Sequence, residues 1–408
     1  MNRWKFYWLR LTRELWVRAS AYAAFGVAAA LLASVAARWV PEGLAERLGG
    51  ESVEQLLTIL ASSLLAVATF SVGAMVTAYT AVSQGATPRV AALVTSDGQT
   101  QRSLATFVGA FLYAIVAVTA INAGYYGAEG RAILFLVSLA VVALVAYRLL
   151  AWINRLSSLA RIGHMIDLVE DRTREALVAR SRRPFLGGRP GVLATGFLIL
   201  SDKTGWVQNV DPDRLEAAGG HGDCDIQVLA APGAFVRRGE ALARIGRDHC
   251  DEKTRSEVHS AFILGPSRSY DQDPRFGLIV LGEIAGKALS PAVNDPGTAI
   301  QVIGAGVRLL DIWLEPPKDD ADPSPCSRVL AAPLADADLL DDIFGQIARY
   351  GAGDVPATIR LLKALRSLAA TPGPMQAPAR DMARELMTRA RQSMPIPADL
   401  ARVRAVKV

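Results

Sequence analysis

The stretch VEQLLTILASSLLAVATFSVGAMVTAYTA occupies residues 53–81, and it decides what kind of protein this chain can form. Its single charged residue, Glu54, lies in the first turn. A helix advances by about 1.5 Å per residue, so roughly 20 apolar residues are enough to cross the hydrocarbon core of a bilayer. Residues 53–81 exceed that length and therefore predict a transmembrane helix.

Three further stretches of similar character surround this one, at residues 19–37, 103–123 and 132–153. Buried core helices of a large soluble protein can also be apolar on every side. Four of them in succession, each of near-bilayer length, favour an α-helical membrane bundle. Residues 1–153 are thus predicted to form a transmembrane domain with four spans, and the lipid bilayer is its first predicted partner.

Tryptophan placement supports these spans, because amphipathic rings prefer the headgroup region of a membrane. Five of the seven tryptophans in the chain lie at or near predicted span ends: Trp4, Trp8, Trp16, Trp39 and Trp152. The opening residues 3–15 mix bases and aromatic residues in the way expected of a helix that lies in the interface.

Charge in the connections predicts the orientation of the spans. Bases dominate before residue 19 and after residue 153, whereas four glutamates outnumber two arginines in residues 38–54. Since cytoplasmic connections carry the excess of Lys and Arg, both termini are predicted to be cytoplasmic. A cleaved signal peptide is the competing interpretation of residues 19–37, and it too leaves the C-terminal region inside the cell.

One face of the second span differs chemically from the rest of the bundle. Small and polar residues recur along it at steps of three or four, which places them all on one side of a helix. They are Thr58, Ser62, Ala66, Thr69, Gly73, Thr77, Thr80 and Gln84. Such a face either packs closely against another helix or lines a pore whose wall is wettable and uncharged.

The two interpretations of this face are compatible if it meets its own copies around an axis, as in a homo-oligomeric channel. No Asp, Glu, Lys, Arg or His lies at mid-depth in any predicted span. Transport that depends on buried carboxylates is therefore disfavoured.

Beyond residue 153 the pattern becomes that of a cytoplasmic α+β domain. Residues 154–190 predict an amphipathic helix that continues the fourth span, followed by a linker rich in Pro and Gly. Residues 191–265 predict a small β barrel or sandwich, in which Gly196–Val207 forms a hairpin. Residues 266–408 predict a helical domain, with helices over 355–368 and 382–391 among others.

Nothing in this region predicts a cofactor or a metal. The run from Val228 to Leu242 resembles half of a biotinyl or lipoyl domain, but the lysine that carries those cofactors is missing. Histidines and cysteines between His221 and His259 do not follow the spacing of a metal site. The chain has three cysteines, Cys224, Cys250 and Cys326, and an odd number argues against a disulfide framework.

The densest motif begins with Arg268-Ser-Tyr-Asp-Gln-Asp-Pro-Arg-Phe-Gly277. Either Asp271 or Asp273 is expected to cap a helix in which Pro274 takes the first position. That helix is expected to end near Leu289, and Asp295 then caps a second helix that begins with Pro296.

Capping does not explain why Arg, Asp, Gln and Asn are so dense around the two helix starts. The candidates for binding a ligand, an anion or a neighbouring subunit are Arg268, Gln272, Asp273, Asn294 and Asp295, and a purely structural turn is the alternative.

At these residues the chain resembles a bacterial family of predicted membrane proteins, domain of unknown function 2254. The resemblance rests on Gln272-Asp273 with Phe276-Gly277, on Ala288-Leu-Ser-Pro-Ala-Val-Asn-Asp-Pro-Gly-Thr-Ala299, and on the connection that follows residue 81. It implies a multi-span inner-membrane protein with a cytoplasmic domain. It carries over no catalytic residue.

The sequence therefore leaves three function classes open. The first is a homo-oligomeric channel or pore with a cytoplasmic gating domain. The second is a membrane-anchored sensor or scaffold whose cytoplasmic domain binds a small ligand, an ion or a protein. The third, an enzyme, lacks any recognisable catalytic motif. Nucleic acid is not an expected partner, because the formal net charge is only +5 and the excess lies mainly beside the membrane.

Overall fold

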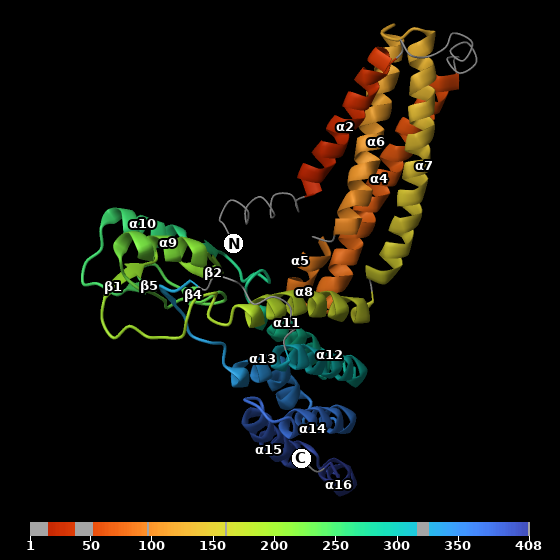
Figure 1. The fold of residues 1–408 in the computed structure, drawn as a ribbon. Coiled ribbons are helices and arrows are strands. Elements are labelled where there is room, and N and C mark those ends of the chain that lie inside the picture. The colour runs from red at the N-terminus through yellow and green to blue at the C-terminus, as the bar shows by residue number, and fades with distance from the viewer. Residues whose placement is uncertain (1–14, 37–51, 96–97, 160, 316–325, 407–408) are drawn as a thin grey trace. The chain divides into compact units, whose positions relative to one another are not determined.

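The computed structural model describes residues 15–36, 52–95, 98–159, 161–315 and 326–406 (Figure 1). The interfacial helix expected within residues 3–15 and the tryptophans Trp4, Trp8 and Trp39 lie outside these ranges. The described chain divides into two compact units, Tyr7–His164 and Met165–Val408, which we call the N-terminal and C-terminal units.

Long helices make up most of the N-terminal unit, as Figure 1 shows. Its elements are α2 (Leu15–Ala36), α4 (Ser52–Gly85), α5 (Pro88–Thr95), α6 (Gly98–Asn122) and α7 (Ala128–Leu159). Helices α2, α4, α6 and α7 correspond to the four predicted spans, and α6 contacts the other three. By length and composition α4, α6 and α7 can each cross a membrane, whereas the fully described apolar stretch of α2 is the shorter Ala19–Ala29.

Two glycines allow α2 and α6 to approach closely. A Cβ atom on Gly26 would lie 2.9 Å from the carbonyl oxygen of Gly109, and one on Gly109 would lie 2.9 Å from Tyr22. Small residues at helix contacts are typical of membrane bundles, because association there depends on close packing. Helix α6 is also tied to α7, since the Tyr113 hydroxyl lies 3.0 Å from the Ser138 hydroxyl.

Helix α8 (Ile162–Arg182) begins after α7 ends at Leu159, and from Met165 onward it belongs to the C-terminal unit. The single continuous helix predicted through this region is therefore interrupted. A group of short strands and helices follows: β1 (Phe197–Leu200), β2 (Gly205–Val210), α9 (Pro212–Gly222), β3 (Ile226–Val228), β4 (Phe235–Val236), β5 (Ala241–Ile245), α10 (Glu252–Ser260) and β6 (Phe262–Gly265).

The strands form two open sheets, with the orders β1-β5-β3-β7 and β4-β2-β6. Of the two predicted alternatives, a small barrel or a sandwich, the closed barrel is therefore not formed by the described residues. The expected hairpin is also wrong, because β1 pairs with β5 while β2 pairs with β4 and β6. Side chains from both sheets fill one core, which includes Val207, Ile226, Leu242 and Ile245.

Strand β7 (Val329–Leu330) comes from well beyond the residues predicted for the β region and pairs parallel to β3. Most of the remaining chain is helical: α11 (Pro274–Ala288), α12 (Pro296–Leu314), α13 (Asp336–Tyr350), α14 (Val355–Ala370), α15 (Gln376–Ser393) and α16 (Pro397–Arg404). Each of these helices contacts at least one other of the group, so they form a helical layer of their own.

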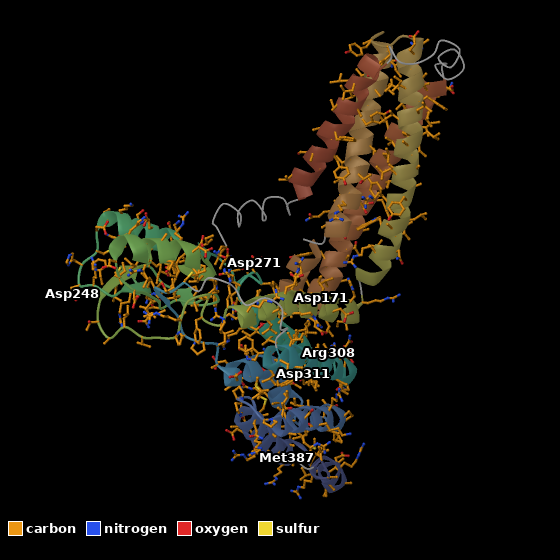
Figure 2. All side chains as sticks on the ribbon, in the orientation of Figure 1. Asp171, Asp248, Asp271, Arg308, Asp311 and Met387 are labelled. Carbon is orange, nitrogen blue, oxygen red and sulfur yellow. The ribbon has the colours of Figure 1, made fainter. Side chains whose placement is uncertain are left out.

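Helix α12 is also long and apolar enough to cross a membrane. It packs instead within the C-terminal unit, against α11, α13 and α14. It carries Arg308 and Asp311, which Figure 2 labels, and Arg308 forms an ion pair with Glu170 of α8. A buried core helix explains its composition better than a fifth span does.

Candidate functional site

The polar face of α4 is exposed on the single chain. All eight small and polar positions that the sequence singled out are exposed, and they are Thr58, Ser62, Ala66, Thr69, Gly73, Thr77, Thr80 and Gln84. A Cβ atom added to Gly73 would find no other atom within 4 Å. No helix among the described residues of the same chain covers this face.

The buried face of α4 lies on the other side of the helix. Its members include Val53, Leu57, Leu64, Ala78 and Val82, which contact the rest of the bundle. At about 100° per residue, the mean directions of the two faces differ by roughly 180°. The polar face therefore points directly away from the helices of its own chain.

The hydroxyl groups on this face are satisfied within the helix. Thr58, Thr69, Thr77 and Thr80 each donate to the carbonyl oxygen four residues earlier, at 2.9, 2.9, 3.1 and 3.0 Å, and Ser62 does so at 3.0 Å. Such a bond uses the hydroxyl proton, and the lone pairs of the hydroxyl oxygen stay available to accept a hydrogen bond from outside the helix. The face presents polarity without charge.

A second cluster surrounds the first half of the densest motif, in the C-terminal unit. Asp273 is only 2% exposed. Its oxygens accept two hydrogen bonds from Arg268, at 2.7 and 3.0 Å, and a third from the Phe276 amide at 3.2 Å. Asp273 is thus the cap of α11 and one half of a bidentate ion pair. Burial raises the pKa of its carboxyl, and the bonds from Arg268 act against that rise.

Aromatic rings enclose the guanidinium of Arg268. Its central carbon lies 5.6 Å from the ring centre of Trp206 and 5.5 Å from that of Phe276. Trp206 in turn packs edge-on against Phe235, with 5.2 Å between the ring centres. Cation–π contacts of this kind stabilise a charge that is largely removed from water.

Gln272, the neighbour of Asp273, pairs with β2 as if it were part of a strand. Its side chain accepts from the Val210 amide at 2.8 Å and donates to the Val210 carbonyl at 3.1 Å. The Gln-Asp pair therefore joins three elements: the end of β2, the loop that carries Arg268, and the start of α11.

The Phe-Gly pair of the motif sets the distance between α8 and α11. A Cβ atom on Gly277 would lie 1.9 Å from the hydroxyl oxygen of Thr173, which is buried in α8. One turn earlier on α8, the buried Glu170 accepts two hydrogen bonds from Arg308, at 2.8 and 2.6 Å. Glycine is required here because the two helices leave no room for a side chain.

The second half of the motif lies elsewhere. Asp295 caps α12 through the Thr298 amide at 3.1 Å and also accepts from the Thr298 hydroxyl at 2.6 Å. These two bonds lower the pKa of the Asp295 carboxyl. Asn294, just before it, is exposed and has a φ of 50°.

Helix α11 separates the two halves by about 22 Å, given its 15 residues. The structure therefore brings Arg268, Gln272 and Asp273 together and leaves Asn294 and Asp295 apart from them.

Sequence reasoning missed Arg180. It lies within the predicted amphipathic helix of residues 154–190 and was not among the candidate residues, yet it is only 6% exposed. Burial lowers its pKa to about 10, so it stays charged at neutral pH, and attraction to Asp273 acts against that lowering. A signal was present, because Arg180 lies three residues after Leu177 and four after Ala176, on the apolar side of the helix.

Two of the histidines in this region lie beside carboxylates. The Nδ1 atom of His221 lies 3.0 Å from an oxygen of Glu257, and the Nε2 atom of His259 lies 3.3 Å from an oxygen of Asp202. Within the described ranges, no group of three His, Cys, Asp or Glu side chains is placed to hold a metal ion. The three cysteines are free thiols.

Comparison with known proteins yields one family and a few uncharacterized relatives. The model of a family described as "Predicted membrane protein (DUF2254)" matches residues 12–367. Uncharacterized proteins of Mycobacterium bovis and Mycobacterium tuberculosis are 33% identical over 124 residues, which is 28% of this chain and 23% of each relative. The match thus spans under a quarter of the length of these relatives. No solved structure matches the chain.

Proposed function

The chain belongs to the family of predicted membrane proteins (DUF2254), and from that premise we propose that it forms a homo-oligomeric pore lined by α4. The exposed polar face of α4 carries this proposal. A face built for packing within one chain would be covered by another helix of that chain, and this one points away from all those described.

The chemistry of the face suits a path for small solutes. Its hydroxyl oxygens offer weak, uncharged binding positions, which allow a solute to enter and to leave. Its small residues, Ala66 and Gly73, leave room for a path or for the close approach of another copy. A hydroxyl that is satisfied by its own helix also tolerates lipid. The alignment of these five hydroxyls with three further small or polar residues over the whole span nevertheless favours a common role.

Conductance tests this function. We expect the purified chain to conduct ions across a planar bilayer, and we expect Gly73→Trp to reduce the conductance severalfold, because the indole would fill the path. Leu139→Trp is the matched control, since Leu139 is an exposed position on α7. A chain that is monomeric by native mass spectrometry and silent in the bilayer at every voltage and tension applied would contradict the proposal.

We also propose that the protein spans a bacterial inner membrane with both termini in the cytoplasm, as the distribution of Lys and Arg predicts. In a variant that lacks the native cysteines, Tyr125→Cys lies in the exposed connection between α6 and α7. A membrane-impermeant maleimide should label it in intact cells. It should not label Ser256→Cys on α10 until the membrane is opened, and the reverse pattern would refute this orientation.

The second candidate function is a membrane-anchored sensor. It is supported by the buried cluster of Arg268 and Asp273 and by the unusual burial of Arg180 in the same unit. It is compatible with a pore if the C-terminal unit controls opening. A chain that binds a ligand but never conducts would favour the sensor over the pore.

A further inference from the structure

A pocket of about 380 Å³ opens in the C-terminal unit beside the Gln-Asp motif. Its wall comes from the last turns of α8, the end of β2, the start of α9 and the loop before α11. All of its lining residues belong to this one unit. Its volume falls within the range of small-molecule sites.

Arg180 lines this pocket, and its guanidinium is poorly satisfied. The group has five N–H donors. Among the described residues its one hydrogen bond is a long contact of 3.4 Å from Nη2 to the Ala332 carbonyl, and its buried Nε has no partner. Asp273 attracts Arg180 electrostatically, but its hydrogen bonds within the described residues come from Arg268 and the Phe276 amide. A cation removed from water in this way is costly unless an anion meets it.

The rest of the pocket wall adds positive charge. Arg182 and Arg183 lie on the same stretch of chain as Arg180, and the carboxylate on the wall is Asp271, which Figure 2 labels. Three guanidinium groups against one carboxylate give the wall a net charge of +2. A doubly charged anion matches that excess better than a single carboxylate does.

The remaining wall is largely apolar and is anchored to the family motif. Leu186, Pro212 and Ala176 line it. Gln272 also lines it and is held in place by its two bonds to Val210. A ligand bound here would contact the motif directly through Gln272. An uncharged part of the ligand could pack against the apolar side chains of the wall.

We propose that this pocket binds a small ligand that carries a phosphate group, and that Arg180 makes the principal contact with the phosphate. Guanidinium groups match the geometry of phosphate oxygens and bind them through paired hydrogen bonds. Such a ligand supplies the hydrogen-bond acceptors that Arg180 lacks. The inference does not rest on the pore, because the site lies wholly within the C-terminal unit.

Two probes distinguish a soluble phosphate from a lipid headgroup. The full-length chain in an uncharged detergent is titrated with inorganic pyrophosphate, and separately with short-chain phosphatidic acid, while heat of binding is recorded. We expect at least one probe to bind. Binding of pyrophosphate supports a soluble ligand, and binding of phosphatidic acid alone supports a headgroup.

Substitution of Arg180 tests the assignment of the site. Arg180→Gln should weaken binding by about tenfold or more, since a hydrogen bond to a charged group is lost. Arg180→Lys keeps the charge without the paired geometry, so an intermediate loss is expected. The control is Arg172→Gln, which removes an equal charge from the same helix at a position paired with the exposed Glu175 outside the pocket.

Two results would overturn the proposal, one from the probes and one from the substitutions. Failure of both probes to bind the native chain refutes it. So does binding that Arg180→Gln and Arg172→Gln weaken to the same extent, because that marks a nonspecific effect of charge. Circular dichroism and gel filtration establish that each variant is folded, and if Arg180→Gln is not, Arg180→Lys provides the comparison with Arg172→Gln.

Discussion

Replacing Asp273 with alanine should lower the free energy of unfolding of the C-terminal unit by about 3–5 kcal/mol, the usual effect of breaking a buried ion pair. The substitution leaves Arg268, whose side chain is only 17% exposed, without its carboxylate partner. It also removes the cap of α11. Pulse proteolysis of the full-length chain in increasing urea measures the change, and hydrogen exchange over residues 268–280 locates it.

The matched control is Asp295→Ala. Asp295 also precedes a proline and caps a helix, but within the described residues its side chain accepts hydrogen bonds from Thr298 rather than from an arginine. Loss of a cap alone costs about 1 kcal/mol. Equal losses for the two alanine variants would mean that Arg268 and Asp273 contribute nothing beyond capping, and the account of the buried pair would then be wrong.

Replacing Gly277 with alanine should destabilise the same unit by about 1–3 kcal/mol, the range for overpacking a tight interior. The new Cβ would meet Thr173 at 1.9 Å from its hydroxyl oxygen and 2.8 Å from its Cβ. Thr173 is buried in a helix and has little freedom to turn away. The same urea titration measures this change.

Gly304→Ala in α12 is the control for this substitution. A Cβ there would meet only the end of the flexible Arg308 side chain, at 3.6 Å. Because alanine favours a helix over glycine by about 1 kcal/mol, this variant should be neutral or more stable. Adding Thr173→Ala should recover part of the loss at Gly277, and a purely additive double variant would contradict a direct clash.

Local rules predicted the long helices of the described residues, but not α9 and α10, which lie within the predicted β region. The apolar runs led to α2, α4, α6 and α7, and the Asp-Pro pairs led to the starts of α11 and α12. Of the two candidates for the first cap, Asp273 rather than Asp271 fills the role. These features depend on neighbours within a few residues, so a single sequence carries enough information to find them.

Long-range pairing was not predictable in the same way. The turn between β1 and β2 suggested a hairpin, yet each strand pairs with partners farther along the chain. Strand β7 joins its sheet from beyond α12. Which partner a short strand selects depends on how the whole core packs, and alternation of residues does not encode it.

The candidate sites, too, were predictable where they depend on local sequence and not where they depend on the fold. Periodicity alone placed eight residues on one face of α4, and the structure adds that the face is uncovered. The motif residues were found from their density, but their separation into two groups at opposite ends of α11 required the fold. Arg180 escaped notice because a base on an amphipathic helix is usually solvated.

The central claim is that the polar face of α4 lines a path through an oligomer. Single cysteines at Thr69, Gly73 and Thr77, in a chain that lacks its native cysteines, provide its most direct test. A charged, thiol-specific methanethiosulfonate is applied while current is recorded across a planar bilayer. We predict that the current falls irreversibly at these positions and stays unchanged for Leu139→Cys. Unchanged current at all three α4 positions, in a chain that still conducts, would contradict the claim.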